Sequence, residues 1–237
     1  MKNVVAPFLL LSASLVAPAF AATAIPEPCP CQPQFDAMAE DAIALVDYKA
    51  LNPAEATGLA GFGIGIVGSY LPVESSDWSI AAGEDVDGLA FVGLQVTKGL
   101  PLDLDVGAFY SYVPGTNIKA YGGELRYAIL PGSTVSPALA LRGSYSTVTG
   151  VENLDLSSTA VDLSLSKGFT FVTPYVGVGY LWGKAEPGPG TTLAEHDSNQ
   201  TKAFVGLRLT LALLGITPEV ERIGNRTLYN LRVGFSF

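Results

Sequence analysis

Candidate chemistry in this sequence is confined to two acidic clusters and one histidine. The segment "EDVD" covers residues 84–87, and "EHD" covers 195–197 around His196, the only histidine in the chain. Carboxylates beside a histidine can activate a water molecule, so Asp85 and Asp87 with His196 are candidates for a hydrolytic site. The alternative is that these loop side chains are simply solvated, and we expect no enzyme. The chain has no Gly-x-Ser-x-Gly element and no second histidine for a metal site.

Two further motifs could be mistaken for binding sites. The segment "GFGIGIVG" (61–68) resembles a phosphate loop in composition, but Gly61, Gly63 and Gly65 are spaced by two on one face of a strand. We expect these glycines to make room for the helix that the sequence predicts over residues 35–51. Cys29 and Cys31 in "PCPC" could pair with each other or with a partner chain, or belong to a flexible N-terminus. We expect no cofactor and no metal.

The elements that must position these residues begin after an export signal. Residues 1–21 combine Lys2, an apolar run and a small-x-small cleavage pattern, which predicts a signal peptide cleaved after Ala21. Residues 22–58 are expected to form a periplasmic segment with one helix over 35–51. The chain is 49% hydrophobic and 15% charged, which excludes a disordered protein. Its formal net charge of -9 argues against nucleic acid as a partner.

From residue 59 to 237 the hydrophobic pattern has a period of two, which predicts an all-β domain. Short glycine-containing turns alternate with longer polar loops at 73–87 and 184–201, as in a membrane barrel with turns at one end and loops at the other. An antiparallel transmembrane β-barrel of about ten strands is expected, with eight as the alternative. The predicted strands are 60–72, 88–98, 102–113, 118–130, 135–148, 154–167, 171–183, 202–214, 216–223 and 227–237.

The two faces of these strands differ in charge. One face is an almost unbroken apolar row, for example Val205, Leu207 and Leu209, while the opposite face carries the ionisable residues and many glycines. A soluble barrel would place the apolar face inward, but aromatic residues at the ends of the apolar rows and glycines on the charged face favour the reverse. The predicted lumenal charges are Asp103, Asp105, Glu124, Arg126, Arg142, Asp162, Lys202, Arg208, Glu219, Glu221 and Arg232. They could form a closed, paired polar core or line a narrow pore.

Aromatic residues predict where the barrel meets the headgroup region of a membrane. The expected girdle consists of Tyr70, Tyr110, Tyr112, Tyr127, Tyr145, Tyr180 and Trp182. The terminal segment "LYNLRVGFSF" alternates to its last residue, so the last strand is expected to pair with the first and close the sheet.

The alternating segment ending in Phe237 resembles the C-terminal signal of bacterial outer-membrane barrels, with Tyr229, Phe235 and Phe237 as its aromatic residues. The segments "TKGLPLDLDVGAFYS", "GGELRYAIL" and "SKGFTFVTPYVGVGY" also resemble uncharacterised proteobacterial barrel proteins. Both resemblances imply a Gram-negative outer-membrane location and partners in membrane lipid and the barrel-assembly machinery. The acidic loops also resemble those of ten-stranded outer-membrane proteases, but the spacing of acid and histidine differs.

The leading expectation for function is therefore a small outer-membrane barrel with a mostly closed lumen and a structural or surface-interaction role. Loops 73–87 and 184–201 are the expected contact regions for a surface partner. A narrow diffusion channel is the alternative, and a barrel-embedded hydrolase using His196 is the second alternative.

Overall fold

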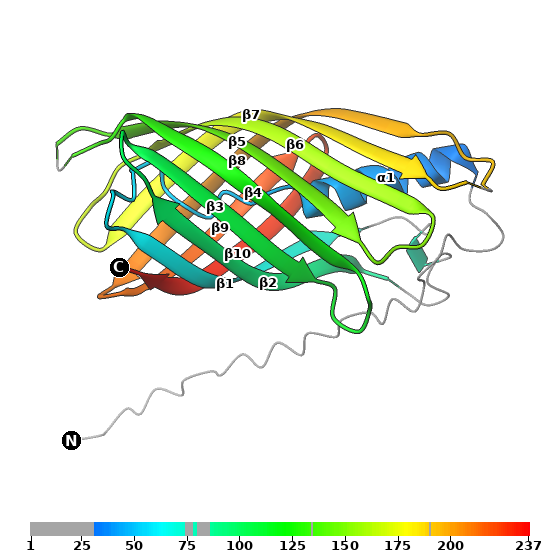
Figure 1. The fold of residues 1–237 in the computed structure, drawn as a ribbon, viewed down its shortest axis with the longest axis horizontal. Coiled ribbons are helices and arrows are strands. Elements are labelled where there is room, and N and C mark those ends of the chain that lie inside the picture. Colours follow the sequence, from blue (N-terminus) through cyan, green and yellow to red (C-terminus); the bar gives the residue numbers. More distant parts are fainter. Residues whose placement is uncertain (1–30, 74–77, 80–85, 134, 190) are drawn as a thin grey trace, which may run out of the picture.

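In the computed structural model, the described residues are 31–73, 78–79, 86–133, 135–189 and 191–237, so the predicted signal peptide and Cys29 lie outside them. The described chain forms one helix and ten strands (Figure 1). The helix is α1 (Gln32–Val46), and the strands are β1 (Phe62–Pro72), β2 (Gly88–Gly99), β3 (Leu104–Tyr112), β4 (Lys119–Leu130), β5 (Ala138–Thr149), β6 (Leu154–Ser166), β7 (Val172–Pro187), β8 (His196–Leu211), β9 (Leu214–Ile223) and β10 (Arg226–Ser236).

The ten strands form one closed barrel in which neighbours in sequence are neighbours in the sheet. β1 pairs antiparallel with β2 on one side and with β10 on the other. At the seam, the Phe62 N–H donates to the Phe237 carbonyl at 3.0 Å and the Phe237 N–H returns a bond of 2.9 Å. The prediction that the last strand closes the sheet is confirmed, with ten strands rather than eight.

Along each strand, exposed apolar residues alternate with buried polar or glycine residues. Ile66, Leu94 and Val205 are 59%, 52% and 58% exposed on the outer surface. The neighbouring inward positions carry buried charges, so the molecule has the inverse of a soluble protein's arrangement. An apolar exterior around a closed sheet leaves no unpaired backbone edge, and this is the organisation of a transmembrane β-barrel.

Among the residues that the structure describes, no helix is both long enough and apolar enough to span a membrane.

The connection between β7 and β8 is shorter than the loop predicted over 184–201. These two strands continue their pairing as far as Lys184 with Asp197 and Ala185 with His196. The added residues are polar and lie outside the apolar part of the barrel wall, so the hydrophobic pattern gave no sign of them. The result is a long hairpin that extends past the end of β9, whose pairing with β8 begins at Ile223.

The segment before β1 runs through the inside of the barrel. α1 lies at the end of the barrel away from the C-terminus, where the long connections are (Figure 1). Residues 47–57 continue along the axis to the turn end, where the Thr57 N–H donates to the Asp105 carboxylate at 3.1 Å. The expected separate periplasmic segment is therefore wrong for residues 31–57, which lie within the barrel. The helix also ends at Val46 rather than at residue 51, because Asp47 has an extended backbone with φ -52° and ψ 144°.

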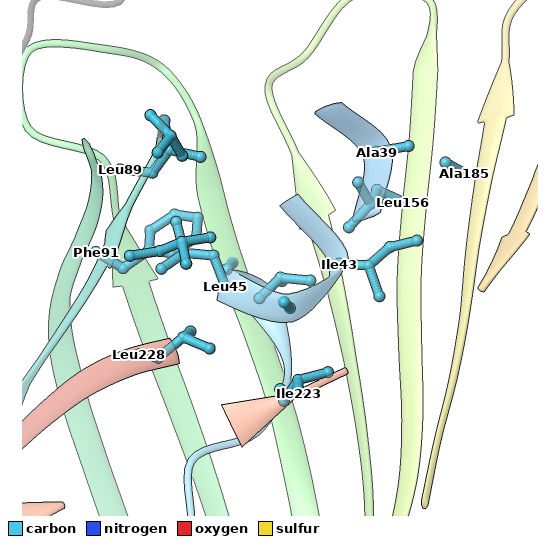
Figure 2. Packing of buried hydrophobic residues seen from close by; sticks show 14 of the residues in the cluster. Ala39, Ile43, Leu45, Leu89, Phe91, Leu156, Ala185, Ile223 and Leu228 are labelled. Carbon is cyan, nitrogen blue, oxygen red and sulfur yellow. The ribbon is translucent and has the colours of Figure 1, made fainter. Parts of the chain in front are cut away.

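The helix fills the loop half of the lumen with apolar side chains. Figure 2 shows Ile43 and Leu45 of α1 among inward-facing residues of the wall, including Phe91, Leu156 and Leu228. Each of these side chains is at most 8% exposed. Burying this apolar surface stabilises the packing of the helix against the wall in the loop half.

Candidate functional site: a plugged and charged lumen

Nearly all of the predicted lumenal charges point into the barrel. Those that are fully buried are Asp105, Glu124, Arg126, Arg142, Asp162, Lys202, Glu219, Glu221 and Arg232, and Arg208 is half-buried. Asp103 was assigned wrongly: it is exposed in the turn before β3. Leu102 and Asp103 have φ angles of 64° and 58°, so the tight turn interrupts the alternation there and β3 begins only at Leu104.

A central group of ion pairs joins the barrel wall to the internal segment, which we call the plug (residues 31–57). Lys202 of β8 bonds to the carboxylate of Asp47 and lies 3.1 Å from Glu221 of β9. Lys49 of the plug lies 2.8 Å from the same Glu221 carboxylate. Sequence reasoning missed Asp47 and Lys49 as site residues, although both follow the apolar helix in the polar segment "VDYKALN".

Arg142 of β5 extends this group of ion pairs, because its partner Asp162 also lies 3.7 Å from Lys202. Its Nε donates to Asp162 at 2.9 Å, and its Nη1 lies 3.7 Å from Glu124. The guanidinium also lies 5.8 Å and 5.5 Å from the ring centroids of Tyr48 and Phe204, within cation–π range. This cation therefore contacts three other strands (β4, β6 and β8) and the plug at once.

Arg126 fixes the plug at the turn end. Its Nη2 donates to Asp105 at 2.8 Å, and its Nη1 donates to the Pro53 carbonyl at 2.7 Å. Because Asp105 also accepts the Thr57 N–H, one buried ion pair holds both ends of the segment from residue 53 to 57. Breaking it would leave backbone groups of the plug without partners.

Glu219 meets neutral donors rather than a base. Its carboxylate accepts the Leu51 N–H at 3.1 Å, the Tyr175 hydroxyl at 2.9 Å and the Asn230 amide at 3.1 Å. Three hydrogen bonds of this kind stabilise a buried carboxylate without a salt bridge. This residue adds a further wall contact to the plug.

Glycines on the inner face leave space for large side chains. A Cβ on Gly107 would lie 2.6 Å from the Tyr48 hydroxyl, and one on Gly183 would lie 2.2 Å from Cγ2 of Ile43. The prediction that Gly61, Gly63 and Gly65 make room for the helix is therefore wrong, and Gly183, which was not predicted, does so instead. In that group, Gly63 and Gly65 instead lie against the side chain of Arg232.

His196 is the first residue of β8, and its side chain faces helix α1 of the plug. Its Nδ1 is 3.3 Å from Asp36 and its Nε2 is 3.5 Å from Glu40, and Glu40 also binds Arg226 of β10 at 2.7 Å. Both ring nitrogens therefore face carboxylates of α1. This side chain holds the helix against the β7–β8 hairpin.

Of the two aspartates predicted to act with His196, the structure describes only Asp87, and none of its described contacts is with His196. Asp87 is exposed, and its backbone carbonyl accepts the Val73 N–H at 3.2 Å. Asp85 lies outside the described residues. The acids beside His196 come from the plug helix, which the sequence pattern did not indicate.

One small cavity lies in the lumen beside the plug. The cavity beside Lys49, Ser69 and Gln95 has a volume of about 20 Å³. A space of about 10–15 Å³ on this measure is needed for one water molecule. That cavity is therefore far too small for a solute to pass.

The predicted girdle residues lie on the outside of the barrel. Their exposed fractions range from 37% for Tyr180 to 54% for Tyr145. Tyr229, Phe235 and Phe237 of the C-terminal segment also point outward, at 52%, 50% and 64% exposed. Contact with headgroups and with the assembly machinery stays a prediction for these residues.

Comparison with known proteins gives likeness only at the level of structure. No protein-family model and no curated protein matches the sequence. The N-terminal β-barrel domain of Pseudomonas aeruginosa OprF matches with a TM-score of 0.41 and 13% identity, over 76% of this chain and 99% of that one. OprG from Pseudomonas aeruginosa matches with a TM-score of 0.40 and 10% identity, over 80% and 99%. The KdgM porin matches with a TM-score of 0.40 and 10% identity, over 74% and 99%.

Proposed function

We propose that this chain is a Gram-negative outer-membrane barrel whose lumen is closed by its own N-terminal segment, with a structural or surface-interaction role. The observation that carries the proposal is the plug itself. Residues 31–57 cross the lumen from the loop end to the turn end and bond to wall residues Lys202, Glu221 and Arg126 on the way. A barrel filled in this way supports display of its loop end better than transport.

The loop end offers the contact region. The β7–β8 hairpin projects beyond β9, and α1 is fixed to it by the Gln32 side chain, which accepts the Ala194 N–H at 2.8 Å. The Trp78 indole in the β1–β2 connection donates to Asp41 of α1 at 2.8 Å. The hairpin, this connection and the helix thus form one surface, through which we propose that loops 73–87 and 184–201 meet a partner outside the cell.

A narrow channel is the alternative, because the described contacts between the plug and the barrel wall are all non-covalent and the plug is joined to β1 only at its C-terminal end. Planar-bilayer conductance of the mature protein separates the two functions, and we expect no conductance steps across a range of salt concentrations. A locked variant extends the test: Ile43→Cys with Gly183→Cys, in a background of Cys29→Ser and Cys31→Ser, can join α1 to β7, since Ile43 fits directly over Gly183.

The outcomes of this experiment differ for each function. A silent wild-type protein supports the closed barrel. Conductance that disappears on oxidation of the locked variant and returns on reduction establishes a channel gated by plug movement, and replaces our proposal. Conductance in both states shows a path around the plug and contradicts the closed lumen.

A further inference from the structure

Arg232 is the one lumenal base in the described chain whose side chain has no partner. It is 0% exposed, and its Nε, Nη1 and Nη2 atoms all lack a hydrogen-bond acceptor among the described residues. The other bases inside the barrel each bond to a carboxylate or a side-chain amide; these are Lys49, Arg126, Arg142, Lys202 and Arg208. A buried guanidinium without a counter-charge is costly, so this position calls for an anion.

The nearest carboxylate by register is already engaged. Arg232 pairs across the β9–β10 ladder with Thr217, two residues from Glu219. The Glu219 carboxylate accepts bonds from Leu51, Tyr175 and Asn230 instead. Among the described residues, no carboxylate oxygen lies within hydrogen-bond distance of the Arg232 guanidinium.

Polar groups of Arg208, Asn52 and Thr217 lie on the β8–β9 side of Arg232. The β8–β9 register places Thr217 between the pairs Gly206–Glu219 and Leu209–Ile216, which brings it beside Arg208. Arg208 donates to the Asn52 side-chain oxygen, which leaves the buried Asn52 Nδ2 without an acceptor. The Thr217 hydroxyl is also unpartnered and 0% exposed.

Two glycines shape the wall on the other side. A Cβ on Gly65 would lie 2.9 Å from Nε of Arg232, and one on Gly63 would lie 3.3 Å from Nη2. The guanidinium thus lies close against the backbone of β1. Any other residue at Gly65 would displace it, so the "GFGIGIVG" segment has a specific role in placing this cation.

We propose that Arg232, with Arg208, Thr217 and Asn52 around it, binds a small inorganic anion, with chloride as the committed ligand. A single negative charge balances the single unpaired guanidinium. The enclosed position, with Arg232 fully buried, favours a compact ion over phosphate. The site is independent of whether the barrel conducts.

The test compares unfolding midpoints of the mature protein in chloride, phosphate and gluconate at one ionic strength. For the wild type, chloride tenfold above its Kd should raise the midpoint by about 3–6 °C over gluconate. Arg232→Gln should lose this difference, and its midpoint in gluconate should equal or exceed that of the wild type, because the unpaired charge is gone. Arg222→Gln, an exposed arginine on β9, is the matched control and should keep the difference.

Diffraction from wild-type crystals grown in bromide gives a second measurement that needs no variant. An anomalous peak within hydrogen-bond distance of Arg232 would support the site. Equal midpoints in chloride and gluconate, or a crystal with water in place of bromide, would overturn it. Stabilisation by phosphate alone would overturn the assignment to chloride.

Discussion

Burial, rather than distance alone, divides the ion pairs of this protein into two energetic classes. The Arg142 and Asp162 side chains are 4% and 1% exposed, whereas those of Lys184 and Glu186 at the end of β7 are 43% and 47% exposed. When one partner of a buried pair is removed, the other charge remains buried without a counter-charge or water. An exposed charge that loses its partner is solvated by water instead.

Arg142→Met is therefore expected to lower the free energy of unfolding by about 3–5 kcal/mol, because Glu124 loses its base and Asp162 keeps only the more distant Lys202. Denaturant unfolding of the refolded barrel measures this. Lys184→Met serves as the control and should leave the midpoint unchanged. Equal effects of the two substitutions would contradict the assignment of Arg142 to a dry lumen.

The outer face should show the depth dependence of a membrane. Val205 lies on the outer surface midway along β8, and Leu211 lies at its turn end, with nearly equal exposures of 58% and 59%. Val205→Arg should cost about 2–4 kcal/mol and Leu211→Arg about 0–1 kcal/mol when the barrel is folded in lipid vesicles. Equal costs at both positions would mean that this face does not meet hydrocarbon.

For single residues, the sequence predicted whether a side chain points into or out of the barrel, but not which residue it contacts there. Period-two alternation assigned Asp162 and Lys202 inward because side chains alternate strictly along a strand. It could not show that Lys202 meets Asp47, since that contact joins residues 155 positions apart. It also failed at Asp103, where a left-handed turn breaks the alternation.

At the scale of the elements, the packing of α1 against the barrel wall depends on a glycine of the wall. Gly183 on β7 leaves the space that Ile43 occupies, and a Cβ there would lie 2.2 Å from Cγ2 of Ile43. The strand ends were predictable from the hydrophobic period to within three residues, except where β7 and β8 extend four and six residues further into their hairpin. The site of the helix was not, because an amphipathic pattern does not state which surface covers it.

Gly183→Val should destabilise the protein by about 1–3 kcal/mol through overpacking against Ile43. Adding Ile43→Ala should recover part of this loss, so that the double-mutant cycle gives a coupling of about 0.5–3 kcal/mol. Gly143→Val is the control, since nothing lies within 4 Å of a Cβ built there. Strict additivity of the two changes would place α1 elsewhere.

At the scale of the whole molecule, the path of the plug places its two ends at opposite ends of the barrel. The exposed Cys31 begins α1 at the loop end, whereas Leu59, 65% exposed, lies beyond the plug at the turn end. Loops of outer-membrane barrels face the outside of the cell and turns face the periplasm. The chain therefore crosses the thickness of the barrel between these two residues.

A membrane-impermeant maleimide should label Cys31 on intact cells of a Cys29→Ser variant. Leu59→Cys, in a background of Cys29→Ser and Cys31→Ser, should react only after the cells are made permeable. Mass spectrometry of the purified protein reads both results. Labelling of Leu59→Cys alone on intact cells would reverse the orientation of the plug.

Continuity between plug and wall has a consequence for biogenesis. β1 starts at Phe62, only five residues after Thr57, and β1 is one side of the seam with β10. If the barrel closed first, helix α1 and residues 47–57 would afterwards have to pass into a lumen that is already complete. The simpler route is that the sheet forms around residues 31–57 while they are already in place. Pairing of β10 with β1 would then be the last step of folding.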